Sequence, residues 1–102
     1  MERWEKGMLA KSLAGHDKNK IYVIIELDDT YVYLADGEIR TLANPKKKKK
    51  KHVQLIRKVH EIDAADDVRI KRILKEYALS QKQSREILIR KNRMGIKIRK
   101  PI

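Results

Sequence analysis

The stretch KSLAGHDKNKIYVIIEL, residues 11–27, decides the fold. It ends in a β-branched and aromatic run that begins at Ile21, which predicts a strand over 21–27. A short extended segment over 7–12 comes before it, and a glycine and polar turn residues lie between the two. The stretch therefore predicts two strands joined by a loop, residues 13–20, that is free to contact a partner.

Three further strands are predicted, over 30–35, 38–42 and 52–56. Asp36-Gly37 predicts a type I′ turn before the strand over 38–42, because glycine and aspartate tolerate the positive φ that this turn needs. Five short strands joined mostly by tight turns are typical of a mainly β fold, a small SH3-like antiparallel barrel that is closed or nearly so.

The alternation of side chains along 21–27 predicts which residues form the core. If Glu26 points outward, then Val23, Ile25 and Leu27 face the core, and Ile39 points inward from the strand over 38–42. Trp4 either plugs one open end of the barrel or stacks on a nucleotide. The tyrosines on the outer face either pack under the tail or form a base-stacking platform; they are Tyr22, Tyr31 and Tyr33.

The C-terminal part differs in kind. From Asp66 onward, apolar residues recur at helical spacing and predict a helix with aspartates at its N-terminal end; they are Val68, Ile70, Ile73, Leu74 and Tyr77. A capping-box pattern at Ser80 predicts either a second helix over 81–91 or one long helix bent there, ended by Gly95. The organisation is therefore an N-terminal extension (1–6), a barrel (7–56) and a basic helical extension (57–102).

Charge points to a polyanionic partner. The chain of 102 residues has a net charge of +12, and residues after position 45 carry 20 basic and six acidic side chains, against six and eight before it. The sequence has no cysteine and its three histidines lack metal-site spacing, so we expect no metal and no cofactor. The sequence has neither a signal-peptide pattern nor a sufficiently long apolar stretch, so we expect a cytoplasmic protein without a membrane partner.

A catalytic site is not predicted. The carboxylates fall in turns and at a helix start, where capping explains them, and no serine is paired with a histidine at a meaningful spacing. The chain also lacks a phosphate-binding glycine loop. We therefore expect a protein that is not an enzyme and has no small-molecule substrate.

The run Lys46–Lys51 is the most conspicuous feature of the sequence that suggests a function. As a loop between two predicted strands it would be fixed in place by the barrel, and six adjacent lysines repel one another unless an anion relieves them. We expect this run to bind phosphates. The basic surface of the predicted helices either lines an RNA groove or is a solvated face.

The loop at Gly15, together with the run LADGEIRTLANPKKKKKKHVQLI over 34–56, resembles the KOW-domain RNA-binding proteins of bacteria, which are similar to KOW-containing large-subunit ribosomal proteins. Asn19 stands where that family has a glycine, and asparagine best tolerates the left-handed conformation. The resemblance implies a ribosome-associated protein that binds structured RNA, ribosomal RNA above all, with ribosomal proteins as further partners.

The expected RNA-binding residues come from the loop, the flanking strands and the lysine run: Lys11, Ser12, Gly15, His16, Lys18, Asn19, Lys20, Arg40, Lys46, Lys47, Lys48, Lys49, Lys50, Lys51 and His52. Their contacts would address phosphate and shape rather than base sequence. Two alternatives stay open, a KOW module that docks on polymerase or ribosomal proteins, and general DNA binding.

Overall fold

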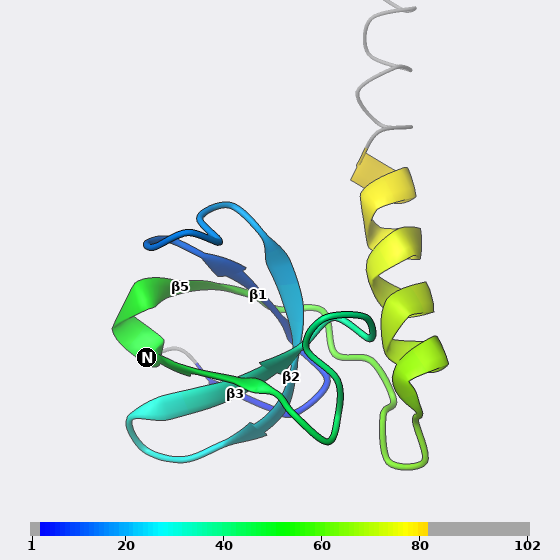
Figure 1. The fold of residues 1–102 in the computed structure, drawn as a ribbon, viewed down its shortest axis with the longest axis horizontal. Helices are drawn as coiled ribbons and strands as arrows, with labels where there is room; N and C mark the ends of the chain where they lie inside the picture. Colours follow the sequence, from blue (N-terminus) through cyan, green and yellow to red (C-terminus); the bar gives the residue numbers. More distant parts are fainter. Residues whose placement is uncertain (1–2, 82–102) are drawn as a thin grey trace, which may run out of the picture.

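The computed structural model describes residues 3–81, which form one five-stranded antiparallel sheet followed by a helix over 67–81 (Figure 1). The sheet order is β4-β3-β2-β1-β5. The bounds are β1 Leu9–Ser12, β2 Ile21–Leu27, β3 Tyr31–Ala35, β4 Lys46–Lys49 and β5 Val53–Ile56, with a 3-10 turn, η1 Lys50–His52, between the last two. The mainly β class is thus confirmed, with β2, β3 and β5 close to their predicted positions.

The sheet curls around a first core. Side chains from β3 and β5 meet in one cluster although two strands separate them in the sheet, so the sheet must bend; the cluster is Met8, Ala10, Tyr22, Ile24, Val32, Leu34, Val53 and Leu55. The edge strands β4 and β5 are not paired with each other, so the sheet is not closed. Trp4 packs against this core.

A second core lies on the other face of the sheet, where the helix covers it (Figure 1). Leu9, Val23 and Ala35 pack there with the fully buried Ile70 and Ile73. The helix begins at the N-cap Asp66, whose Oδ1 accepts the N–H of Arg69 at 2.9 Å, which confirms the predicted start. Val68, predicted on the apolar face, is 65% exposed.

Because both faces of β2 are covered, the predicted division of its side chains is wrong. Tyr22 and Ile24 lie in the first core, whereas Val23 and Ile25 belong to the second. A register shift between Ile24 and Glu26 then returns Leu27 to the first core. The error arose because both faces of β2 are covered along most of its length, so the exposed Glu26 does not mark a solvent face of the whole strand.

The predicted strand over 38–42 is irregular, and the lysine run takes its place in the sheet. The carboxylate of Asp36 accepts the N–H groups of Glu38 and Arg40 at 2.8 and 2.9 Å, which closes this segment into a compact turn. Of the non-glycine residues in 3–81, Asn19 alone has positive φ, so Asp36 does not form a type I′ turn. Ile39, predicted to point inward, is 75% exposed.

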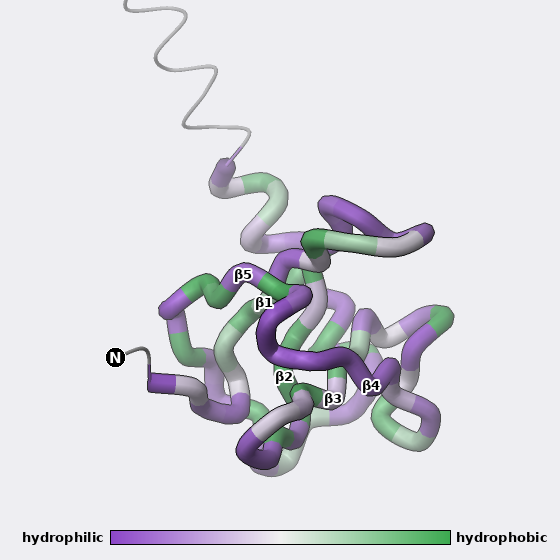
Figure 2. Tube along the Cα trace, turned by 90° about the vertical axis from the view of Figure 1, so that its left-hand side faces the viewer, coloured by the Kyte–Doolittle hydropathy of each residue, from purple (hydrophilic) through white to green (hydrophobic). Residues whose placement is uncertain are grey.

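Four lysines form an edge strand where a loop was expected. Figure 2 shows β4 as hydrophilic throughout, beside strands that carry the apolar residues. Charged side chains are a common feature of edge strands, where they oppose pairing with another chain.

The C-terminal predictions are only partly covered by the structure. Ser80 and Gln81 are helical, so Ser80 does not cap a second helix. The predicted segment over 81–91 beyond Gln81, and Gly95, lie outside the described residues. Within residues 3–81, the helix is neither long nor apolar enough to cross a membrane.

Candidate nucleic-acid interface

Because side chains alternate between the two faces of a strand, consecutive lysines of β4 point to opposite faces of the sheet. Lys46 and Lys48 lie opposite Leu34 and Val32, whose side chains are in the first core. Directly opposed residues share a face of the sheet, so these two, the inner lysines, point toward the concave side. Lys47 and Lys49, the outer lysines, lie opposite Tyr33 and Tyr31 and point away from it.

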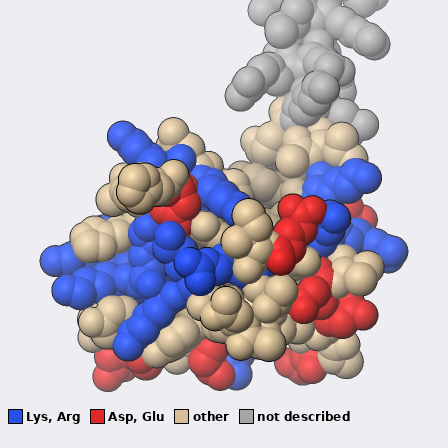
Figure 3. Space-filling view, in the orientation of Figure 1, with Lys and Arg blue, Asp and Glu red and all other residues tan. Residues whose placement is uncertain are grey.

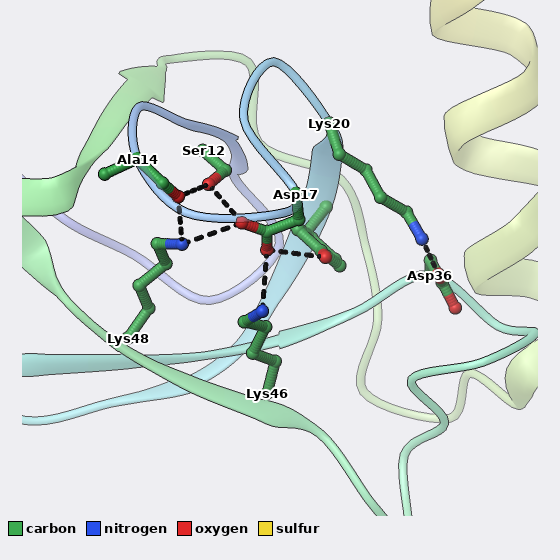
Figure 4. Close-up of polar contacts among 8 residues, drawn as sticks. Ser12, Ala14, Asp17, Lys20, Asp36, Lys46 and Lys48 are labelled. Carbon is green, nitrogen blue, oxygen red and sulfur yellow. Dashed lines mark hydrogen bonds and ion pairs between the residues drawn. The ribbon is translucent and has the colours of Figure 1, made fainter.

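Asp17, from the loop between β1 and β2, holds the inner lysines (Figure 4). Its Oδ1 accepts from Lys48 Nζ at 2.9 Å and from the Ser12 hydroxyl at 2.7 Å. Its Oδ2 accepts from the Tyr22 hydroxyl at 2.8 Å and lies 3.0 Å from Lys46 Nζ. Every acceptor position of the carboxylate is therefore used.

The Asp17 cluster, meaning Asp17 with its four partners, sits at the concave side of the sheet. The Asp17 side chain is only 9% exposed. Burial by itself would raise the pKa of Asp17, but the hydrogen bonds from Lys48, Ser12, Lys46 and Tyr22 outweigh burial and hold this pKa well below the ordinary 3.8. The carboxylate is consequently ionised at neutral pH and binds both ammonium groups.

The pKa of Tyr22 is raised, whereas that of Asp17 is lowered. Burial, and then its hydrogen bond to the charged Asp17, raise the pKa of the Tyr22 hydroxyl above its usual 10.0, while the positive charge of Arg40 opposes the increase. The phenol therefore stays protonated and acts as a donor. Tyr22 is 2% exposed, so the prediction that it shares an outer face with Tyr31 and Tyr33 is wrong.

The loop over 13–20 lies beside the lysine strand. Asn19 has φ +76°, which confirms the left-handed conformation predicted for it in place of glycine. The Lys48 ammonium also donates to the Ala14 carbonyl at 2.8 Å, and a Cβ built on Gly15 would lie 3.7 Å from the same nitrogen. The loop and the lysine run are therefore neighbours in the structure.

Outside the Asp17 cluster, further cations on this half of the molecule are exposed or partly exposed. Lys47 lies over the rings of Tyr31 and Tyr33, 4.2 and 6.0 Å from their centroids, and Lys50 lies 5.4 Å from the ring centroid of Trp4. Within residues 3–81 no ion pair joins a carboxylate to any of the following lysines: Lys18, Lys47, Lys49, Lys50 and Lys51. In Figure 3 the broadest group of basic side chains lies over the half that contains η1 and β4, and further basic side chains lie beside the helix.

Four residues of the expected set are committed to contacts inside the protein. Ser12 is fully buried, and Lys20 donates to the buried Asp36 (Figure 4). Lys46 and Lys48 are held by Asp17. As placed here these four are not free to bind an RNA, because their polar groups are already paired.

The other residues of the expected set lie in several different parts of the structure. His16 and His52 are exposed at the loop and at η1, next to the unpaired lysines. Lys11 is on β1, which β2 and β3 separate from β4. Arg40 belongs to the irregular segment after β3 rather than to a strand. The structure therefore brings together the loop and the lysine run, and leaves Lys11 apart in the sheet order.

Sequence reasoning missed both aspartates that organise this region. Asp17 was treated as turn chemistry, and Asp36 as part of a hairpin. A single acidic residue inside an otherwise basic loop was the available signal for Asp17, because a lysine strand nearby needs a counter-charge. Residues 3–81 contain no cluster of side chains suited to hold a metal ion.

Compared with known proteins, the chain matches no family model and no curated protein sequence.

Proposed function

We propose that this protein is a non-enzymatic RNA-binding protein whose outer lysines contact the phosphates of a structured RNA. The observation that carries the proposal is the division of β4: Asp17 binds both inner lysines, whereas Lys47, Lys49 and the neighbouring Lys51 are exposed and lack an acidic partner within the described residues. The edge strand and η1 thus present exposed cations that have no acidic partner among residues 3–81.

The physical benefit of an RNA at this surface is relief of like-charge repulsion. Each phosphate that a lysine neutralises releases a condensed counterion, which favours binding and makes it salt-dependent. Lys18 and His16, on the adjacent loop, extend the basic surface beyond the strand. Contacts of this kind read backbone position and shape, so little sequence preference is expected.

We also propose that the curled sheet is an SH3-like barrel of the KOW kind, acting in the cytoplasm on ribosomal RNA or beside ribosomal proteins. Support comes from the strand–loop–strand unit at Gly15, from the left-handed Asn19, and from the common core that β3 and β5 share. A barrel of this kind would hold the loop and the lysine strand side by side.

The test is a salt titration of binding to a structured RNA. Replacement of Lys47, Lys49 and Lys51 by serine removes three phosphate contacts, so log K should fall with log salt at a slope that is shallower by about 2–3. The matched control removes three exposed cations elsewhere, Lys58, Arg72 and Lys75, and should keep most of the wild-type slope.

Two outcomes would contradict the proposal. Equal losses in both triple variants would mean that net charge, not this surface, drives binding. An interaction with RNA that high salt leaves intact would instead indicate an apolar interface, as expected for a protein-docking module.

A further inference from the structure

A hollow of about 330 Å³ lies beside η1 and is lined by residues of two kinds. Lys49 and Lys51, from β4 and η1, are basic, whereas Asp29 and Thr30, from the turn between β2 and β3, carry a carboxylate and a hydroxyl. All four residues are exposed. Asp29 forms no ion pair with either lysine, or with any other cation of residues 3–81, so its carboxylate is open to a ligand.

The two sides of the hollow are held in place by backbone contacts. The N–H of Lys50 donates to the carbonyl of Thr30 at 2.9 Å, which ties η1 to the turn between β2 and β3. The turn itself is closed by Asp28, whose Oδ1 accepts the N–H groups of Thr30 and Tyr31 at 2.9 and 2.7 Å. The Asp29 side chain is therefore not needed to form the turn.

A phosphate alone does not explain this arrangement. Two lysines suit a phosphate, but a carboxylate across the same hollow repels one. A ribose-phosphate unit of RNA carries both complementary groups, since its phosphate is an anion and its 2′-hydroxyl is a hydrogen-bond donor. A carboxylate is the strongest acceptor that a protein offers to such a hydroxyl.

We propose that this hollow binds a ribose-phosphate unit, with Lys49 and Lys51 on the phosphate and Asp29, aided by Thr30, accepting the 2′-hydroxyl. Asp29 is then a specificity-determining residue that selects RNA over nucleic acids without a 2′-hydroxyl. This inference rests on the proposed function and names the chemical unit that the surface recognises.

The test compares an RNA hairpin with the same hairpin carrying 2′-fluoro riboses, which keep the sugar pucker but lack the donor. The wild-type protein should bind the RNA about tenfold more tightly, the effect of one hydrogen bond to a charged group. Asp29→Ala should reduce this ratio to within about twofold, and Thr30→Val should reduce it by less. The ratio is read instead of the affinity because loss of a carboxylate strengthens phosphate binding to both hairpins.

Glu76→Ala is the matched control. It removes an exposed carboxylate from the helix, on the opposite side of the molecule from η1 (Figure 1), and should leave the ratio unchanged. A wild-type ratio near one, or an equal loss in Asp29→Ala and Glu76→Ala, overturns the inference while RNA binding stands. Failure of the wild-type protein to bind either hairpin overturns the proposed function and this inference with it.

Discussion

The inner and outer lysines are the same residue type, adjacent in one strand, and they differ in almost every physical respect. The side chains of Lys46 and Lys48 are 28% and 11% exposed and are bound to Asp17. Lys47 and Lys49 are exposed and face away from that cluster. The comparison teaches that strand period, and not composition, decides which charges of a lysine run are available to a partner.

The two sets should also contribute to different properties. The inner lysines share a nearly buried carboxylate, and removal of that carboxylate leaves their charges without compensation. The outer lysines have water around them and contribute little to folding, as isolated surface charges usually do. Stability should therefore depend on the inner set and RNA affinity on the outer set.

The largest expected effect comes from removing the counter-charge itself. Asp17→Ala removes the carboxylate that two largely buried ammonium groups and the Tyr22 hydroxyl share, and should lower the free energy of unfolding by about 3 kcal/mol. Urea denaturation followed by circular dichroism measures it. A loss below about 0.5 kcal/mol, the usual size for surface substitutions, would show that the Asp17 cluster is not a stabilising unit.

The pH dependence of stability also tests the contribution of Asp17. Because the pKa of Asp17 is lower in the folded protein than the usual value near 3.9 of an unfolded chain, its contribution is complete above about pH 5 and is lost as the pH falls through the folded pKa. The difference in unfolding free energy between wild type and Asp17→Asn should thus be largest near neutral pH and should narrow below about pH 4. A difference that stays constant down to the acid limit would exclude this origin.

Substitutions of single lysines should give the smallest differences in stability, and they compare an inner with an outer lysine directly. Lys48→Gln loses a charged hydrogen bond to Asp17 and should cost about 2 kcal/mol, whereas Lys49→Gln, one residue away, should change stability by less than about 0.5 kcal/mol. Thermal unfolding of the two variants under identical conditions measures both. Similar melting temperatures would mean that the strand does not divide the lysines as described.

Local pattern was sufficient for much of the fold. The apolar run at Ile21 predicted β2, and helical spacing predicted the helix that buries Ile70 and Ile73. The left-handed conformation of Asn19 was predicted from the glycine that the resembled KOW motif has at this position. The strand over 38–42 failed because Asp36 bonds its own segment into a turn. The strand at Lys46–Lys49 was missed because its place in the sheet is set by pairing with β3, which no local propensity of lysine reveals.

The site was predictable in location but not in detail. Residues around Gly15 and the lysine run indicated the two segments that the structure places together. The pairing of Asp17 with residues some 30 positions away depends on tertiary contacts, and so does the burial of Ser12. Which lysines of the run are free to bind a partner could therefore be predicted only once the strand register of the sheet was known.

The most direct test of the central claim is the RNA affinity of two double variants with equal net charge, Lys46→Ser with Lys48→Ser and Lys47→Ser with Lys49→Ser. Affinity is measured at a temperature at which circular dichroism shows both variants folded. We expect the outer pair to bind a structured RNA at least about tenfold more weakly, with a salt slope shallower by about 2, and the inner pair to stay within about threefold of wild type. Equal losses in the two variants, or a larger loss in the inner pair, would contradict the division of the lysine strand into a structural and a binding face.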